Sequence, residues 1–288
     1  MKKPSITART IAMHRAIHLL SDPKPTVIED PMAEALAGIA RNKRLGLSDP
    51  CYHDLMWKQT RALTLARSRY TEDLLASYPA SEPCQYLLLG AGLDSSAFRL
   101  TSKQRASTQV FEVDQPSMQQ WKQERLATLG FNIPDHLHFI AVDFETDNLT
   151  EKLAQSSFQR QLPTLVSFLG VSYYLTEKSL TETLSMLLDS IDGNCRIVFD
   201  FVTRPLPSVT AAEQLWFQHY ETIVEQSGEP WIGVYPPSVI CELMSDAGFD
   251  QVRHLDATQI NHMYFNQRSD ELHFPASMSL IDASRNNV

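Results

Sequence analysis

The sequence predicts an α/β protein with a doubly wound, mostly parallel sheet of seven strands and an N-terminal helical cap. Two observations support this. From about residue 85 onward, short apolar runs alternate with amphipathic helical stretches, a pattern typical of parallel strands covered by helices on both faces. The first 80 residues show helical periodicity instead. We therefore expect residues 1–80 to form the cap and 81–288 the sheet domain, joined as one structural unit.

Three helices are expected in the cap. Apolar residues recur at helical spacing over 9–20. The segment 29–40 begins with Asp30, an expected N-cap, and Pro31, whose missing N–H is harmless at the first helical position. A long amphipathic stretch covers 52–78 and ends before Pro79.

The remaining elements follow from apolar runs and caps. Thr176 is the expected N-cap of one helix and Gly193 its expected stop, while another helix ends at Gly248. The expected strands are residues 85–90, 108–114, 136–144, 163–170, 195–202, 250–257 and 271–283. The expected helices between them are residues 115–130, 148–161, 176–193 and 236–249.

Composition restricts the classes of partner. The 288 residues are 43% hydrophobic and carry a net charge of −9. An acidic chain is a poor candidate for nucleic-acid binding, which needs clustered Lys and Arg. No apolar run approaches the roughly 20 residues of a membrane span, and no apolar segment follows the two N-terminal lysines. We therefore expect a cytoplasmic protein without a nucleic-acid or membrane partner.

A metal site is not expected. The four cysteines are scattered, with no C-x-x-C pair, so reduced and mostly buried thiols are the better interpretation. His136 and His138 would share one face of a strand, but an H-x-H pair alone is weak support for a metal site.

The first predicted strand ends in a glycine turn. The stretch "YLLLGAGLDSSAFRL" places Gly90, Ala91 and Gly92 directly after the apolar run. Without a Cβ the backbone can adopt positive φ, and a ligand can approach the main chain closely. Ligands of parallel sheets bind at the carboxyl ends of the strands, where the strand order reverses. Because a G-x-G after a strand is also a common turn, the motif alone is a weak signal.

Acidic residues follow the next two strands. Asp114 ends the second strand, about twenty residues past the glycines, where a carboxylate can accept both hydroxyls of a ribose. Asp143 follows the third strand and could accept the adenine amino group, with Phe144 available to stack on the ring; it could also be an ordinary loop residue. The three strand ends together predict a nucleoside site.

Asp94, two residues after the glycine turn, favours a cationic nucleoside. A dinucleotide site prefers a third glycine, and here that position is Ser95. Asp94 places a negative charge where a pyrophosphate would approach, although it could also be a helix N-cap. The charge suits S-adenosylmethionine, which carries an ammonium and a sulfonium. An NAD(P)-dependent oxidoreductase remains the alternative.

The segments "LLLGAGLDSSAFRL", "VFEVDQPSMQQWKQERL", "VDF" and "LGVSYYLT" occur in this order along the chain. They resemble the leucine carboxyl methyltransferase family, a Rossmann-like branch of the class I S-adenosylmethionine-dependent methyltransferases that includes bacterial polyketide O-methyltransferases. The resemblance extends from about residue 5 to 203. It implies an S-adenosylmethionine-dependent O-methyltransferase.

The resemblance also implies cofactor contacts. Arg67, in "LARSRY", matches the arginine that binds the cofactor carboxylate, and Arg9 is a weaker match for a second basic residue there. Glu112 is expected to orient Asp114. The full expected set is Arg9, Arg67, Gly90, Ala91, Gly92, Asp94, Glu112, Asp114, Gln115, Asp143, Phe144 and Leu169.

One position departs from the family pattern. The carboxyl methyltransferase itself has a Glu where this chain has Leu169, so a cofactor contact is absent or supplied differently, and a phosphatase C-terminus is less favoured as substrate.

Tyr173 and Tyr174 are the expected catalytic residues near the point of transfer, but packing aromatics would look the same, and no clear general base is found. This mildly favours a carboxylate acceptor, which needs no base.

An aromatic-rich stretch follows the fifth strand: Trp216, Phe217, His219, Tyr220, Trp231 and Tyr235. It could wall an apolar acceptor pocket or belong to the core. The expected function is methyl transfer to a carboxylate or hydroxyl of a small molecule. An inactive nucleoside-binding protein that acts through a partner is a further alternative. The acceptor and the oligomeric state are left open.

Overall fold

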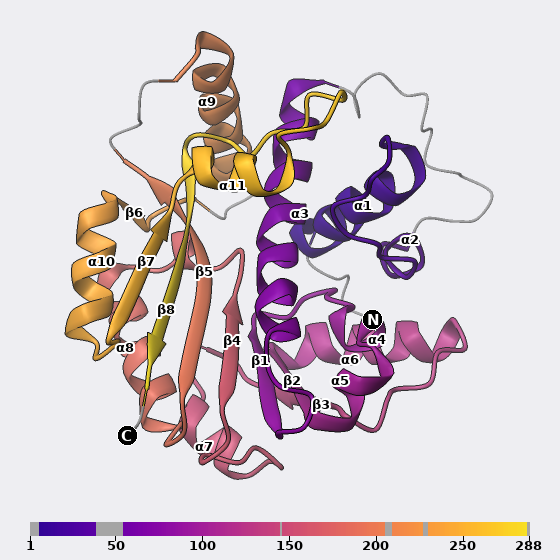
Figure 1. Ribbon diagram of the computed structural model, residues 1–288, viewed down its shortest axis with the longest axis vertical. Coiled ribbons are helices and arrows are strands. Elements are labelled where there is room, and N and C mark those ends of the chain that lie inside the picture. The colour runs from indigo at the N-terminus through magenta and orange to yellow at the C-terminus, as the bar shows by residue number, and fades with distance from the viewer. Residues whose placement is uncertain (1–5, 39–53, 145, 205–208, 227–229, 287–288) are drawn as a thin grey trace.

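A central β-sheet with helices on both faces forms the protein (Figure 1). The computed structural model describes residues 6–38, 54–144, 146–204, 209–226 and 230–286. The strands lie in the order β3-β2-β1-β4-β5-β8-β7, with β6 beside β5. Their bounds are β1 Cys84–Leu89, β2 Thr108–Asp114, β3 Leu137–Ala141, β4 Thr164–Phe168, β5 Cys195–Thr203, β6 Val234–Tyr235, β7 Gln251–Leu255 and β8 Met278–Arg285.

The sheet confirms the predicted doubly wound, mostly parallel class. Strands β1 to β6 pair in parallel, and only β8 runs antiparallel, between β5 and β7. The two-residue β6 is a strand that the sequence pattern does not predict. The order reverses between β1 and β4, whose paired residues run from Gln85 opposite Thr164 to Leu88 opposite Ser167. This register brings Gly90 and Leu169, two of the expected site residues, to the same edge of the sheet.

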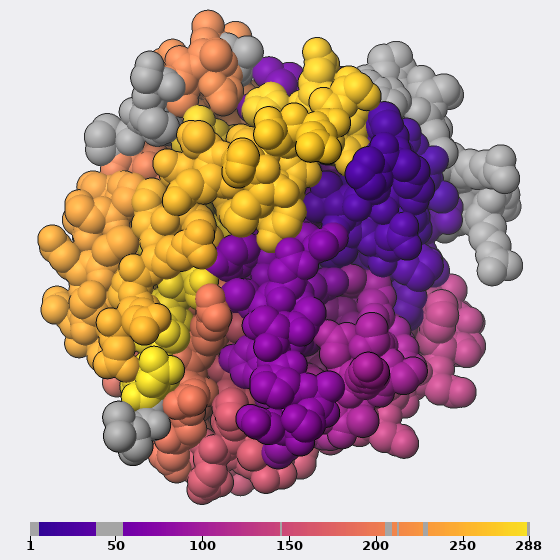
Figure 2. All heavy atoms as spheres, in the orientation of Figure 1, coloured from indigo at the N-terminus to yellow at the C-terminus, as the bar shows by residue number. Residues whose placement is uncertain are grey.

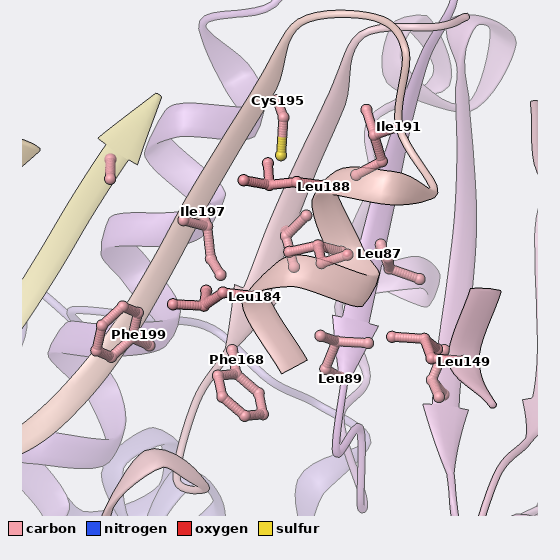
Figure 3. Close-up of a cluster of buried hydrophobic side chains, with 14 of the residues drawn as sticks. Leu87, Leu89, Leu149, Phe168, Leu184, Leu188, Ile191, Cys195, Ile197 and Phe199 are labelled. Atoms are coloured by element: carbon pink, nitrogen blue, oxygen red, sulfur yellow. The ribbon is translucent and has the colours of Figure 1, made fainter. Parts of the chain in front are cut away.

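The two faces of β5 show how the layers are built. Ile197, Phe199 and Phe201 are fully buried on one face and join a cluster with the leucines of α8 (Glu177–Asp189). In Figure 3, Leu184 and Leu188 of this helix lie over β1, β4 and β5. The intervening β5 residues point to the other face, where α3 (Leu55–Ala76) packs. The alternation expected of a strand thus divides the core into two layers.

Helix α3 is part of the core and not only of a cap. Its N-cap is Asp54, whose carboxylate accepts a hydrogen bond from the backbone N–H of Trp57. Leu65 and Tyr70 share one hydrophobic cluster with strands β5, β7 and β8. The C-terminal segment before β8 lies against the N-terminal helices (Figure 2), where Lys58 forms an ion pair with Glu271. The proposed division at residue 80 therefore separates segments that share a core.

Several predicted boundaries need correction. The helix expected over 29–40 is only α2 (Ala33–Leu36), and Asp30 is not its N-cap because the helix begins later and Met32 takes that position; residues 39–40 lie outside the described residues. Gly193 lies beyond the end of α8, and it is needed because a Cβ there would lie 2.5 Å from the carbonyl oxygen of Gln161. Strand β3 ends three residues before residue 144, and β8 begins seven residues after residue 271.

The remaining helices either overlap predicted segments or were not predicted. Helices α1 (Ile6–Ser21), α6 (Pro116–Thr128), α7 (Leu149–Ala154) and α10 (Pro237–Asp246) correspond to predicted segments, and Gly248 follows α10 with φ of +104°. The unpredicted helices are α4 (Ser96–Arg99), α5 (Ser102–Ser107), the 3-10 turn η2 (Ser172–Tyr174), α9 (Ala211–Gln226) and α11 (Ala257–Tyr264). Within the described ranges, none of the helices combines the length and apolar character needed to cross a membrane.

Candidate active site

A cavity of about 810 Å³ lies at the carboxyl ends of β1, β2 and β4, bounded by α1 and α3. Its volume falls within the range of small-molecule sites, and its position is the switch point of the sheet. Helix α1 contributes Ala8, Ile11 and Arg15, and α3 contributes Leu63 and Arg67, residues spaced to share one face of each helix.

Most of the expected site residues line this cavity. They come from segments far apart in the sequence, and the fold brings them together at one edge of the sheet. These lining residues are Arg67, Gly90, Ala91, Gly92, Asp94, Asp114, Gln115, Phe144, Leu169, Tyr173 and Tyr174. Their contacts with a ligand stay predictions.

Three expected residues do not line the cavity. Arg9 is exposed, and its Nε donates a hydrogen bond to the carbonyl oxygen of Ala37 at 3.0 Å. The carboxylate of Glu112 is buried behind the site in an ion pair with Lys122 at 2.5 Å. Asp143 is half-buried beside Phe144. Their cofactor roles also stay predictions, with Glu112 placed to act through Lys122, which donates to the carbonyl oxygen of Asp94 at 2.6 Å.

The glycine turn has the geometry that only glycine tolerates easily. Gly90 has φ of +72° and Gly92 φ of +52°. A Cβ built on Gly90 would lie 2.8 Å from Cγ2 of Val171, which also lines the cavity. The missing side chain therefore keeps open a part of the cavity wall.

Two carboxylates face this turn. Asp114 accepts hydrogen bonds from the backbone N–H groups of Gly92 at 2.6 Å and Gln115 at 2.7 Å. Burial raises the pKa of Asp114, and these two N–H donors oppose the rise. Asp94 accepts from the backbone N–H of Ser96 at 2.7 Å, so it caps the first residue of α4 and lines the cavity at the same time.

The charges around the cavity are unequal. Two cationic side chains line it, and both are already neutralised: Arg15 pairs with Asp30 at 2.8 Å, and Arg67 pairs with Asp200 at 2.6 Å. In contrast, the side chains of Asp94 and Asp114 form no ion pair with any other described residue, and the donors to their carboxylates are backbone N–H groups and the hydroxyl of Ser96. The site therefore carries uncompensated negative charge. Such a site attracts a cation and opposes a pyrophosphate.

These features fit S-adenosylmethionine. Its positive charge suits the negative charge of Asp94 and Asp114, and the glycine turn leaves room for its aliphatic part at Gly90. A metal ion has no comparable support, since no cluster of three or more His, Cys, Asp or Glu side chains suited to metal binding occurs in the part of the chain that the structure describes.

Tyr173 is a neutral phenol. It is buried, and burial followed by the charge of Asp200 raises its pKa well above the usual value of a tyrosine. Nη1 of Arg67 lies 3.4 Å from its hydroxyl oxygen. The ring of Tyr174 packs edge-on against it, with centroids 4.8 Å apart. A phenol held neutral can donate or accept a hydrogen bond but cannot serve as a general base near neutral pH.

The aromatic stretch after β5 is divided between cavity and core. Tyr220 lines the cavity and stacks on Trp231 with centroids 5.2 Å apart. Trp216 and Phe217 are buried and belong to the cluster that includes α3, whereas His219 is exposed. Both interpretations of the stretch therefore hold, each for different residues.

Sequence reasoning missed some of the site. Arg15, Gly170 and Val171 line the cavity, and Asp200 lies directly behind it. Arg15 could have been noticed as a charge on the apolar side of α1. The pairing of Asp200 with Arg67 spans 133 positions and leaves no local pattern.

Comparison with known proteins supports the same conclusion. The family model for leucine carboxyl methyltransferase matches residues 8–188. A protein of Bacillus subtilis (strain 168) named "Putative S-adenosyl-L-methionine-dependent methyltransferase YktD" is 34% identical over 208 residues, which cover 72% of this chain and 67% of that one. A similarly named protein of Saccharopolyspora erythraea is 28% identical over 208 residues, covering 72% and 71%.

Solved structures show the same fold. A structure described as a "putative methyltransferase" from Thermobifida fusca YX has a TM-score of 0.58 at 15% identity and covers 99% of this chain and 96% of its own. A DUF574 family protein from Streptomyces avermitilis also has a TM-score of 0.58, at 11% identity, covering 98% of each chain. With the family model matched over most of the length, this chain belongs to the leucine carboxyl methyltransferase family, whose members are S-adenosylmethionine-dependent methyltransferases.

Proposed function

We propose that this protein transfers the methyl group of S-adenosylmethionine to an oxygen atom of a small-molecule acceptor, either a carboxylate or a hydroxyl. The observation that carries the proposal is the pair of uncompensated carboxylates, Asp94 and Asp114, beside the glycine turn at Gly90. They match the positive charges of this cofactor, while the cations in the same cavity are neutralised by Asp30 and Asp200.

Three side chains of the cavity have proposed roles in holding the cofactor. Asp114 accepts from the ribose hydroxyls through the lone pairs that Gly92 and Gln115 do not use. Phe144, at the exposed rim, stacks on the adenine beside Asp143. The guanidinium of Arg67 binds the carboxylate of the methionine part. These contacts hold the cofactor so that the acceptor oxygen can approach the methyl carbon in line.

The chemistry itself demands little of the protein. When bound, S-adenosylmethionine supplies a methyl group on a positively charged sulfur that is already a good leaving group. The acceptor oxygen forms the new bond to the methyl carbon, the C–S bond breaks with its electron pair on sulfur, and any proton on the acceptor is lost to solvent. Positioning of two reactants can account for about 7–11 kcal/mol of a barrier.

The uncharged part of the cavity, which we take as the acceptor region, favours a hydroxyl acceptor over a carboxylate acceptor. Leu63, Leu169, Tyr174, Tyr220 and Ile232 line it and carry no charge. A carboxylate acceptor would lose its hydration here without gaining a cation, since Arg15 is paired with Asp30 and Arg67 is assigned to the cofactor carboxylate. An apolar compound with an acidic hydroxyl, such as a phenol, avoids this loss.

The pH dependence of the rate tests this proposal. Because Tyr173 stays protonated, the phenolate must come from ionisation of the acceptor itself. The rate constant kcat/KM should therefore rise about tenfold per pH unit up to the pKa of the phenol, and the break in the profile should move when a more acidic phenol is used. Transfer of a labelled methyl group to matched phenols and benzoates, measured from pH 6 to 9, checks this. Preferential formation of methyl esters, or a break that does not move with the acceptor, would contradict a phenolic acceptor.

A further inference from the structure

We propose that Asp200 is a positioning residue that decides which edge of the Arg67 guanidinium faces the cofactor. The inference rests on the proposed function, in which Arg67 binds the carboxylate of S-adenosylmethionine. Asp200 itself does not line the cavity, because its side chain is completely buried on β5 beneath it. It acts on the ligand only through Arg67.

The contacts of Asp200 join three parts of the cavity wall. Its Oδ2 accepts from Nη1 of Arg67 on α3 at 2.6 Å, and its Oδ1 accepts from the backbone N–H of Gly170 after β4 at 2.7 Å. Its carbonyl oxygen accepts from the hydroxyl of Ser172 at 2.5 Å. One residue of β5 therefore joins helix α3 to the turn after β4, and both of these line the cavity.

The guanidinium is held with one side occupied and the other side available. Both side-chain hydrogen bonds of Arg67 to described residues, to Asp200 and to Tyr173, leave from Nη1. The remaining N–H groups, on Nη2 and Nε, are therefore available to fork onto a carboxylate.

Gly170 makes this orientation possible. A Cβ built on it would lie 3.0 Å from Nη2 and 3.2 Å from Nη1 of Arg67, so the guanidinium rests against a bare backbone. Because the N–H of Gly170 is bonded to the other oxygen of the same carboxylate, Asp200 holds Gly170 and Arg67 in register with each other.

Substitution of Asp200 by Asn would break one contact selectively. The amide oxygen of Asn can still accept from the N–H of Gly170. The amide NH₂ would then meet the N–H of Arg67, donor against donor, and the guanidinium would lose its anchor. We expect the arginine to turn and its alignment with the cofactor carboxylate to be lost, with the ribose and adenine contacts intact.

The fold contains a matched control. Asp282 on β8 is almost fully buried and bonds Arg196 through both oxygens at 2.7 Å and the hydroxyl of Tyr70 at 2.5 Å. This carboxylate, guanidinium and phenol set has the same chemistry as that of Asp200 but lies outside the cavity lining. Asp282→Asn therefore reproduces the loss of a buried carboxylate and of its pairing with a partly exposed arginine, without touching the site.

The test compares two ligands. S-adenosylhomocysteine carries the amino-acid carboxylate, and 5′-methylthioadenosine lacks the amino-acid part. With Asp200→Asn, calorimetry should show S-adenosylhomocysteine bound at least tenfold more weakly and methylthioadenosine bound within twofold of the unmodified protein. With Asp282→Asn, both affinities should stay within twofold, although thermal unfolding shows a lower midpoint for both variants.

Arg67→Lys provides a second variant if Asp200→Asn does not fold. The lysine ammonium keeps a charge for Asp200 but has no second edge for a ligand, so the same selective loss of S-adenosylhomocysteine is expected. Equal weakening of both ligands, or unchanged affinity for both, would overturn the role of Asp200. A separate result, no binding of either ligand by the unmodified protein, would instead contradict the proposed function.

Discussion

Replacing Gly90 with alanine is expected to weaken the binding of S-adenosylhomocysteine more than tenfold and to lower the free energy of unfolding by about 2–4 kcal/mol. The backbone of this residue has φ of +72°, and the new methyl group would lie 2.8 Å from Cγ2 of Val171. Valine is stiff about χ1, so it cannot turn away easily. The methyl group would also occupy cavity space between two residues that line it. Calorimetry and thermal unfolding measure the two effects.

Gly130→Ala is the matched control for this substitution. Gly130 has φ of +76°, nearly that of Gly90, but a Cβ there would meet no heavy atom within 4 Å. It should reproduce the backbone strain, about 1–2 kcal/mol, without the contact and without any effect on ligand affinity. If both alanine variants bound S-adenosylhomocysteine equally well, the bare backbone at Gly90 would not serve the cofactor.

The second large effect is expected from Asp114→Asn, which should weaken S-adenosylhomocysteine binding at least tenfold and also lower the stability. Hydrogen bonds to a charged group contribute roughly 1.5–3 kcal/mol each, so losing the charge exceeds the 1.4 kcal/mol of a tenfold change. The loss of stability has a separate cause. Gly92 and Gln115 donate to different oxygens of the carboxylate, and Asn has one oxygen, so its NH₂ would meet one of these N–H groups. Burial raises the pKa of Asp114, so removal of the buried charge offsets part of this loss at neutral pH.

A ligand without ribose hydroxyls completes the test of Asp114. Calorimetry with the 2′,3′-dideoxy analogue of S-adenosylhomocysteine should show weak binding to the unmodified protein and no further loss with Asp114→Asn, because the contact has already been removed. Equal additional weakening for both ligands would show that Asp114 acts elsewhere. Thermal unfolding at pH 7 should show a midpoint below that of the unmodified protein, because one of the two backbone donors loses its acceptor.

Local signals in the sequence were sufficient for most of the elements. Apolar runs predicted β1 to β5, and the N-cap at Thr176 was confirmed by the hydrogen bond from the backbone N–H of Ser179. The prediction at Asp30 was wrong because the helix begins only at Ala33, with Met32 at the N-cap position. Asp30 still accepts from the backbone N–H of Met32 through Oδ1, while Oδ2 bonds Arg15 and Ser95. Local capping rules do not detect such tertiary partners.

The candidate site was predictable where a strand end carries its own motif. Gly90 and Asp114 follow β1 and end β2, and parallel strands bring such ends to one edge. The role of Asp200 could not be predicted in this way. It lies in the middle of an apolar strand, and its partners Arg67 and Gly170 are brought to it only by the packing of α3 on the sheet and by the turn after β4.

The central claim is that this cavity is built for a nucleoside that carries positive charge and no phosphate. Titration of the unmodified protein with S-adenosylmethionine, S-adenosylhomocysteine and NAD in one calorimetric series tests it most directly. We predict one-to-one binding of both adenosyl ligands at micromolar concentration and no heat from NAD at millimolar concentration. Saturable binding of NAD, with neither adenosyl ligand bound, would contradict the account.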